Sequence, residues 1–309
     1  MASVSIVIPT LNRPKALARA LTSARAQTGV DDLDIEILVV DNSADGNARA
    51  GVAAIAAAPG HAIHYVSAPV PGVANARNAG VAAATGDWIA FLDDDEEAAP
   101  DWLASHVATA RRTGAAAVFG PVGAEAEDDR PIGPLAPYFS RSLDLPDGAD
   151  VTGRAAYLGT NNSMFERATC LAGDRPFDTS MNEIGGEDTL LLKRLVEEGK
   201  RFAWSARGGV TEWVPERRLN WAYVRKRKFL SGQIRVLTHW KAQPVEWTRI
   251  AFWMAAGSIQ TVLHGIAALV LAPIDPVRAE VARVKMNGGL GKLLWLRSRP
   301  ALYGSGLVS

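Results

Sequence analysis

The chain has 309 residues, 48% of them hydrophobic and 21% charged, which excludes a disordered protein and suffices for one large domain or two. The net charge of zero hides an uneven distribution. Residues 1–192 carry 13 Lys and Arg against 26 Asp and Glu, whereas residues 193–309 carry 20 against 7. Cys170 is the single cysteine, so an intrachain disulfide is excluded, a reducing compartment is expected, and we assign this thiol no role.

Apolar, β-branched segments alternate with helical patterns along the first third of the chain. The pattern predicts strands at 3–10, 35–43, 62–68 and 88–92, and helices from Pro14 onward and at 48–57 and 75–85. This rhythm is typical of an α/β fold whose mostly parallel sheet is flanked by helices. The first segment has no preceding basic region and contains Pro9, so we interpret it as a strand, not a signal peptide, and expect a cytosolic catalytic part.

Polar residues follow three of these predicted strands, at 10–13, 41–43 and 93–95. Ligands of parallel sheets bind beyond the carboxyl ends of the strands, so these residues are expected to line one crevice. No glycine-rich phosphate loop follows the first strand. Its absence argues against dinucleotide-binding and P-loop proteins, and it leaves a sugar nucleotidyltransferase as the weaker alternative.

Residues 86–97, "GDWIAFLDDDEE", end an apolar strand on five consecutive acids. Carboxylates are hard oxygen ligands suited to Mg²⁺ or Mn²⁺, and a metal ion would relieve their repulsion while neutralising a phosphate. The other interpretation is that the acids cap a following helix that opens at Pro100 and Asp101, because helix N-termini favour negative charge. The run therefore predicts either a metal site or a helix start.

Six segments occur together in a fixed order: "SIVIPTLNR", "ILVVDNSADG", "GVANARNAG", "GDWIAFLDDDEE", "GTNNSMFER" and "GGEDTLLLKRL". In order and spacing they resemble the family 2 inverting glycosyltransferases of the GT-A fold, especially the bacterial exopolysaccharide branch with succinoglycan-type glucosyltransferases. The resemblance covers about residues 3 to 230. It implies a GT-A (nucleotide-diphospho-sugar transferase) catalytic domain over 1–219, with a nucleotide-binding half at 1–98 and an acceptor half at 99–219.

The resemblance also implies a donor site for a nucleotide-diphosphate sugar, with a UDP-sugar expected. It places the DXD motif on Asp93 and Asp95, with Asp95 as the direct Mn²⁺ or Mg²⁺ ligand and Asp93 nearer the ribose or a metal-bound water. The other implied donor-binding residues are Thr10, Arg13, Asp41, Arg77, Asp94, Asn161, Asn162 and Arg217. Each of these residues also has a purely structural interpretation. Thr10 could simply shape a turn, Asp41 could form an Asx-type turn, and Arg77 could be a solvated charge on an Ala-rich helix.

Glu187 and Asp188 fall at the start of an amphipathic pattern, where acids also make a good helix cap. The resemblance implies that this pair supplies the catalytic base, which we assign to Asp188, with Glu187 positioning the acceptor. A carboxylate that deprotonates an acceptor hydroxyl and a metal that neutralises the leaving diphosphate give one displacement with inversion. A non-catalytic carbohydrate- or partner-binding module of the same fold is the other alternative.

Residues 220–309 are basic and apolar, and a membrane-associating helical region is expected there. Aromatic residues interleave with four consecutive bases at 225–228, which also suits nucleic acid, but no recognition motif accompanies them, so we expect a membrane surface and no nucleic acid. Residues 251–274 lack charge and are long enough to span a bilayer, to lie in its interface, or to be buried in the protein. We expect the cytoplasmic face of the inner membrane and a saccharide or lipid-linked saccharide acceptor.

Overall fold

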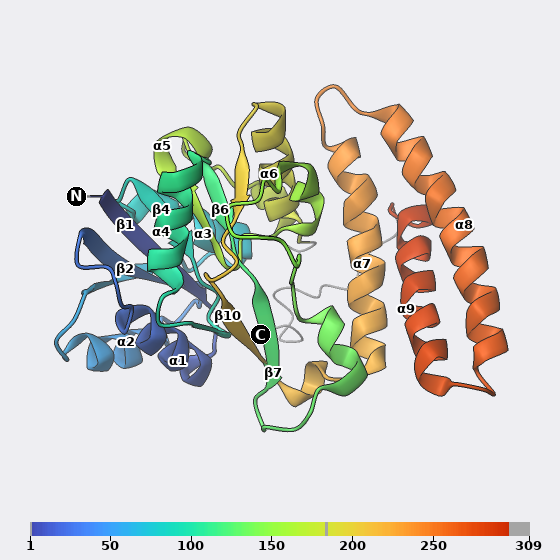
Figure 1. Cartoon of the computed structure of the whole chain (residues 1–309), viewed down its shortest axis with the longest axis horizontal. Helices are drawn as coiled ribbons and strands as arrows, with labels where there is room; N and C mark the ends of the chain where they lie inside the picture. The colour runs from blue at the N-terminus through green and yellow to red at the C-terminus, as the bar shows by residue number, and fades with distance from the viewer. Residues whose placement is uncertain (1, 183–184, 297–309) are drawn as a thin grey trace.

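The computed structural model describes residues 2–182 and 185–296. Its centre is a seven-stranded sheet (Figure 1) whose neighbouring strands pair in parallel, except that β8 runs antiparallel to β4 and β6. In spatial order the strands are β3 (Ala62–Ser67), β2 (Leu33–Asp41), β1 (Ala2–Thr10), β4 (Trp88–Phe91), β8 (Ser163–Glu166), β6 (Ala117–Phe119) and β9 (Phe202–Trp204). The predicted α/β fold with a mostly parallel sheet is confirmed.

A second, three-stranded sheet was not predicted. Its order is β5 (Glu96–Ala98), β10 (Val210–Val214) and β7 (Val122–Ala126). Glu96 and Glu97 therefore belong to a strand. The next helix begins only at Trp102, with Asp101 as its N-cap residue and no acid in its first turn. The interpretation of the acidic run as a helix start is wrong, because backbone pairing with β10 takes up its last two residues.

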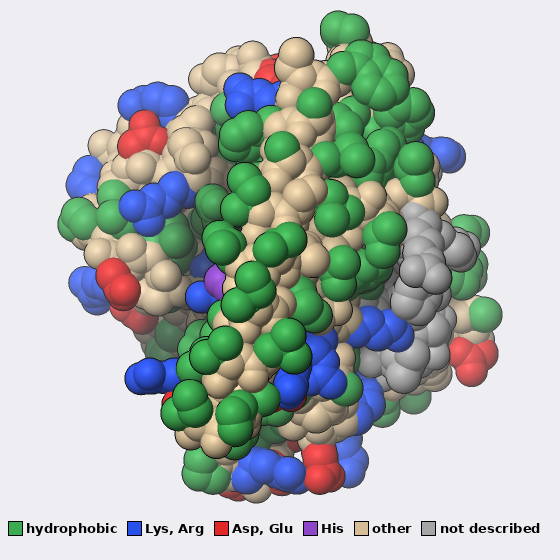
Figure 2. All heavy atoms as spheres, turned by 90° about the vertical axis from the view of Figure 1, so that its right-hand side faces the viewer, with side chains coloured by type: hydrophobic (Ala, Val, Ile, Leu, Met, Phe, Trp, Pro, Cys, Tyr) green, Lys and Arg blue, Asp and Glu red, His purple; other side chains and the backbone are tan. Residues whose placement is uncertain are grey.

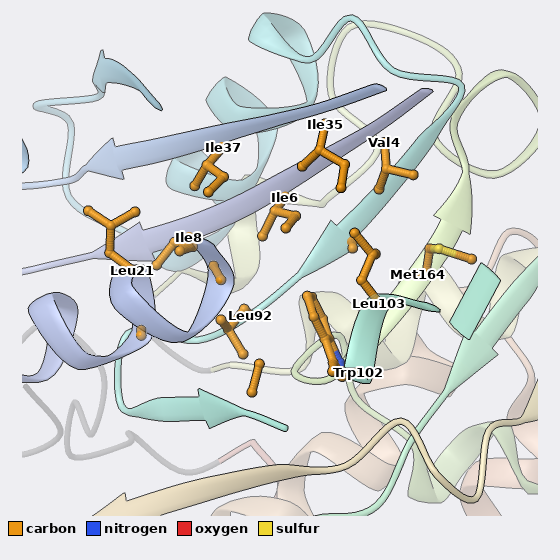
Figure 3. Close-up of a cluster of buried hydrophobic side chains, with 14 of the residues drawn as sticks. Val4, Ile6, Ile8, Leu21, Ile35, Ile37, Leu92, Trp102, Leu103 and Met164 are labelled. Atoms are coloured by element: carbon orange, nitrogen blue, oxygen red, sulfur yellow. The ribbon is translucent and has the colours of Figure 1, made fainter. Parts of the chain in front are cut away.

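Helices cover both faces of the main sheet, and alternation along the strands supplies the two cores. In β1, Val4, Ile6 and Ile8 enter one core with Leu21 and Trp102 (Figure 3), whereas Val7 enters the other. The helices of this part are α1 (Pro14–Arg25), α2 (Arg49–Ala56), α3 (Val73–Ala83), α4 (Trp102–Thr113), α5 (Arg167–Cys170) and α6 (Glu187–Glu197). Short 3₁₀ helices are η1 (Gly133–Tyr138), η2 (Thr152–Tyr157), η3 (Thr179–Met181) and η4 (Glu216–Arg218).

Three long helices follow: α7 (Trp221–Trp240), α8 (Trp247–Leu271) and α9 (Pro276–Leu293). They lie side by side with α9 in the middle and α8 outermost (Figure 1). Small residues let α8 and α9 approach closely, since a Cβ built on Gly289 would lie 2.7 Å from the carbonyl oxygen of Gly257. Gln260 is used at this contact, where it accepts from Lys292 and donates to the Lys285 carbonyl.

The opposite side of α8 is a continuous apolar surface, visible as a green band in Figure 2. Within the described ranges, α8 is the one helix long and apolar enough to cross a membrane. It packs against α9 and α7, so the interpretation that this segment is buried against the catalytic core is wrong. Its exposed residues recur at helical spacing: Phe252, Ile259, Val262, Leu263, Ile266, Leu269 and Val270.

Candidate active site

The carboxyl ends of β1 and β4 bring the first polar groups together. Because these strands are parallel neighbours, Thr10 at the end of β1 lies beside the acids that follow β4. The Thr10 hydroxyl donates to Asp94 Oδ2 at 2.8 Å. Arg13, the N-cap residue of α1, donates through Nη1 to Asp94 Oδ1 and Asp95 Oδ2, each at 2.9 Å. The expected crevice therefore gathers four of the predicted residues: Thr10, Arg13, Asp94 and Asp95.

A second arginine reaches Asp95 from the end of the small sheet. Arg218 in η4 donates to Asp95 Oδ2 at 3.0 Å, and its Nη1 lies 3.7 Å from Glu212 Oε1 in β10. Arg217, the residue assigned from the sequence, has an exposed side chain, whereas that of Arg218 is buried. Both arginines belong to the segment "EWVPERR", and the buried one, Arg218, is its last residue.

Arg77 connects the donor side of the site to α6. It is buried in α3, where it pairs with Glu187, and its Nη2 lies 3.5 Å from Asp93 Oδ1. Burial raises the pKa of Glu187 to about 7 in spite of the Arg77 charge. Arg77 is thus a buried ion-pair residue and not a solvated charge on an Ala-rich helix.

Asp188 lies at the first turn of α6, next to Glu187 but less buried. A Cβ built on Gly159 would lie 3.2 Å from Asp188 Oδ2 and 2.8 Å from Asn161 Oδ1, so glycine at this position leaves room for both side chains. The α6 N-cap residue is Gly186, and Asp188 Oδ1 accepts from the Thr189 backbone N–H in the first turn at 2.6 Å. The carboxylate thus caps this helix end through Oδ1, while its Oδ2 lies beside Gly159.

Two residues of this site were not singled out from the sequence. Glu96 is buried, accepts from Asn161 Nδ2 at 2.9 Å and from the Asp93 backbone N–H at 3.0 Å, and has a pKa well above its usual value because of burial and then Asp93. Arg141 donates to Asn161 Oδ1 at 3.1 Å. Glu96 belongs to the acidic run, but no local pattern marks Arg141, which a single bridge to Val122 brings here.

Two predicted donor-binding residues direct their side chains into the protein. Asp41 accepts from the backbone of Ser43 and Ala48 and from the Tyr65 hydroxyl, each at 2.9 Å. Burial alone would raise the pKa of Asp41, but these hydrogen bonds outweigh it and lower the pKa. Asn162 is fully buried and bonds to Trp102 and to the Pro121 and Gly208 carbonyls. Both side chains therefore stabilise loops behind the crevice.

The donor set at the end of β4 fits a hard divalent cation. Across 2–182 and 185–296, no three His, Cys, Asp or Glu side chains form a ready-made metal cage. Mg²⁺, however, is usually held by one or two carboxylates completed by substrate phosphate oxygens and water. Asp93 is one-third exposed, at 33% of its side chain. Burial, with added repulsion from Asp95 and Asp93, raises the pKa of Asp94 to about 6, so a cation would lower the energy of this cluster.

Comparison with known proteins agrees with this arrangement. The model of the family described as "Glycosyl transferase family 2" matches residues 5–167. The succinoglycan biosynthesis protein ExoM of Rhizobium meliloti (strain 1021) is 38% identical over 234 residues, 74% of this chain and 73% of that protein. ExoO of the same strain is 30% identical over 220 residues, 69% of this chain and 61% of that protein.

Solved structures share the fold over nearly the whole chain. The mannosyltransferase PcManGT from Pyrobaculum calidifontis, in complex with GDP-Man and Mn²⁺, has a TM-score of 0.63 at 20% identity, with 96% of this chain and 88% of that chain covered. S. aureus TarS 1–349 in complex with UDP-GlcNAc has a TM-score of 0.55 at 16% identity, with 96% and 92% covered. With its GT-A fold and the matches to the family model and to ExoM, this chain belongs to glycosyl transferase family 2 and is a glycosyltransferase.

Proposed function

We propose that this glycosyltransferase moves a sugar from a nucleotide-diphosphate sugar, with inversion, to a hydroxyl of a lipid-linked saccharide during bacterial exopolysaccharide synthesis. The observation that carries the proposal is the buried chain of contacts from Asp93 through Arg77 to Glu187. It joins the acids that suit a donor diphosphate to the acidic pair that suits an acceptor. The name of the 38% identical relative, a succinoglycan biosynthesis protein, supports the exopolysaccharide setting.

Asp188 is the proposed general base. Glu187 is buried, and Arg77 holds its Oε1. Asp188 is more exposed and lies beside Gly159, where the chain leaves space. In the proposed step, Asp188 takes the proton of the acceptor hydroxyl. The hydroxyl oxygen forms the new bond to the anomeric carbon of the donor sugar, and the bond from that carbon to the diphosphate oxygen breaks. Glu187, fixed by Arg77, positions the acceptor.

Asp93 and Asp95 are the proposed metal ligands. When bound, Mn²⁺ or Mg²⁺ supplies Lewis-acid neutralisation of the leaving diphosphate. Arg13 and Arg218, which both donate to Asp95, lie where cations can bind diphosphate oxygens once the donor enters. The nucleotide-binding half at 1–98 and the acceptor half at 99–219 would then meet at Asp95, Arg77 and α6.

Residues 220–309 are proposed to hold the enzyme on the cytoplasmic face of the inner membrane. The apolar surface of α8 supports this placement, and so does the excess of Lys and Arg after residue 192. An enzyme bound to that surface meets acceptors that are themselves anchored in lipid. The acceptor is therefore proposed to be lipid-linked.

Calorimetry with UDP-, GDP- and dTDP-sugars, with Mn²⁺ and with EDTA, tests the donor site. We expect one nucleotide class to bind in a metal-dependent way to the wild type and to Asp101→Ala, a matched loss of a nearby half-exposed carboxylate. Asp95→Ala should lose this binding while keeping its circular dichroism spectrum. Tight binding that ignores both the metal and Asp95 would refute the proposed donor site.

A further inference from the structure

Four cations line one side of the C-terminal helices: Lys228 and Arg235 on α7, and Lys285 and Lys292 on α9. We call these four residues the cationic face. Each helix contributes two residues seven positions apart, which places both on the same side of that helix. In the part of the chain that the structure describes, none of the four forms an ion pair. Arg225 and Arg283, on the same two helices, both pair with Glu280.

Gly288 forms the floor between the two flanks of the cationic face. A Cβ built on it would lie 3.2 Å from Lys228 Cγ and 3.3 Å from Gln260 Nε2 of α8. Any larger residue here would take up the space between α7 and α8. Lys292 closes one end, with its Nζ 2.6 Å from Gln260 Oε1. Glycine at this position therefore lets the Lys228 and Gln260 side chains lie directly against the α9 backbone.

The four charges repel one another. Partial desolvation and the neighbouring cations, among them Arg235 and Lys285, hold the pKa of Lys228 below its usual value. The pKa of Lys292 is lowered in the same way, by desolvation and then by Arg235 and Lys228. A group of cations that no carboxylate neutralises is stabilised by an anion that bridges it.

Arg235 connects the cationic face to the acceptor side of the active site. Its guanidinium lies 5.3 Å from the Tyr157 ring centroid and 5.1 Å from that of Trp253 in α8, and it donates to the Ala156 carbonyl at 3.1 Å. Tyr157 precedes Gly159, the residue beside Asp188, by two positions. One arginine therefore contacts both the loop that approaches the proposed base and the apolar helix.

The other margin of the cationic face meets the apolar surface of α8. Trp253, Gln260 and His264 of α8 lie on this side, and partial desolvation and then Lys285 lower the pKa of His264. Figure 2 shows blue and purple side chains in the recess beside the green band. A lipid whose tail meets α8 would bring its headgroup into this recess.

We propose that the cationic face binds the phosphate or diphosphate group of the lipid-linked acceptor, with the lipid chain along α8 and the sugar extending toward Asp188. This rests on the proposed function. The occupant is an acceptor headgroup and not the bulk anionic lipid, because Arg235 connects these cations to the loop beside the proposed base. The donor diphosphate is assigned elsewhere, at Asp93 and Asp95.

Vesicle flotation tests this assignment. The probes are phosphatidylcholine vesicles doped with a polyisoprenyl diphosphate, and charge-matched vesicles doped with phosphatidylglycerol. The test variant is Lys228→Gln/Lys285→Gln, which changes two exposed side chains. The control is Lys226→Gln/Arg249→Gln, which removes the same charge, with residue 226 on the other side of α7 from Lys228.

We expect the wild type and the control to bind diphosphate vesicles several-fold more tightly than phosphatidylglycerol vesicles, and the test variant to lose that preference. Equal binding of both vesicles by the wild type, or equal loss in the two variants, would overturn the proposal. Nucleotide-sugar calorimetry on the test variant separates this outcome from failure of the proposed function. The test variant should bind the nucleotide sugar as tightly as the wild type does. Failure of the wild type itself to bind a nucleotide sugar would refute the proposed donor site instead.

Discussion

Glu187 and Asp188 are adjacent in the chain, yet their surroundings differ. Glu187 is buried against Arg77, whereas Asp188 is half-buried beside Gly159. A buried carboxylate that an arginine holds is out of reach of an acceptor hydroxyl, whereas a half-buried one can come within hydrogen-bond distance of it. The assignment of the base to Asp188 depends on this difference.

Asp188→Asn should lower kcat by about 100-fold or more, since removal of a general base costs on the order of 10² to 10⁴ in rate. Nucleotide release in the presence of acceptor measures it, and donor affinity by calorimetry should be unchanged. Glu197→Gln, an exposed change at the other end of α6, is the matched control. Near wild-type turnover in Asp188→Asn would show that another group is the base.

Arg77→Ala should lower the free energy of unfolding by roughly 3 kcal/mol, because removal of one partner of a buried ion pair leaves the other charge uncompensated. Adding Glu187→Gln should restore part of the loss, giving a favourable coupling in a double-mutant cycle. Urea unfolding in EDTA measures all four proteins. Additive effects of the two changes would mean that the pair contributes no interaction energy.

Glu212→Gln should gain stability relative to the wild type as the pH rises. Burial, with repulsion from Asp95, raises the pKa of Glu212 to about 7, above its usual 4.5. Between these values the folded state binds more protons than the unfolded state, so this group's contribution is present below pH 4.5 and lost as the pH rises to 7. Urea unfolding in EDTA at pH 5 and pH 8 compares the two proteins, and a pH-independent difference would contradict the shift.

At this scale the sequence identifies the acids and arginines of the crevice but not which way each side chain points. Asp41 ends β2 and Asn162 precedes β8, but both side chains bond to the backbone of neighbouring loops. A polar residue at a strand end can either contact a ligand or hydrogen-bond within a turn, and the sequence pattern does not distinguish these two roles. Arg141 carried no signal, because only long-range pairing brings it to Asn161.

At the scale of elements, α8 was predicted as one apolar segment whose placement remained open. It packs lengthwise on α9, which carries Arg278, Arg283 and Lys285 along its length. A charge at the bilayer centre costs roughly 2.5–3.5 kcal/mol on insertion scales, so α9 would resist entering the membrane with α8. We therefore predict that α8 lies in the interface, with its exposed side toward the lipid.

Ile266→Glu/Leu269→Glu should abolish flotation with phosphatidylglycerol vesicles and leave unfolding in lipid-free buffer nearly unchanged, because both side chains are exposed. Asp31→Ala/Asp32→Ala on the catalytic side, also exposed, is the control. Alkaline carbonate should release the membrane-bound wild type. Resistance to carbonate would indicate a span, and retained flotation of the double variant would exclude α8 as the contact.

The strands and helices up to residue 92 lie within about two residues of their predicted bounds, because buried parallel strands have a strong apolar signal. The small sheet was missed for the opposite reason. β5 is "EEA" and β10 is "VTEWV", and neither is long or apolar enough to stand out. Their pairing is decided by contacts between segments more than a hundred residues apart.

At the scale of the whole molecule, the charge division follows the architecture. The acidic part, residues 1–192, supplies every described strand except β9 and β10, and the basic part includes the three long helices. We propose that the boundary near residue 219 separates catalysis from membrane attachment. Family membership also favours a transferase over the sugar nucleotidyltransferase and the binding module that the sequence left open.

This division predicts that membrane attachment and donor binding are separable. Ile266→Glu/Leu269→Glu should bind its nucleotide sugar with wild-type affinity in calorimetry and lose turnover on an acceptor embedded in vesicles. A water-soluble acceptor analogue should restore the turnover. Loss of donor affinity in this variant would show instead that the helices support the crevice itself.

Arg77 lies between Asp93 and Glu187, so one guanidinium is shared by two sites. If an incoming diphosphate attracts Arg77, the ion pair between Arg77 and Glu187 is weakened. An acceptor that displaces Glu187 likewise changes the affinity for the donor. Thermodynamic linkage makes the two effects equal in size. A substitution that changes how Arg77 is held at one site is therefore expected to change affinity at the other as well.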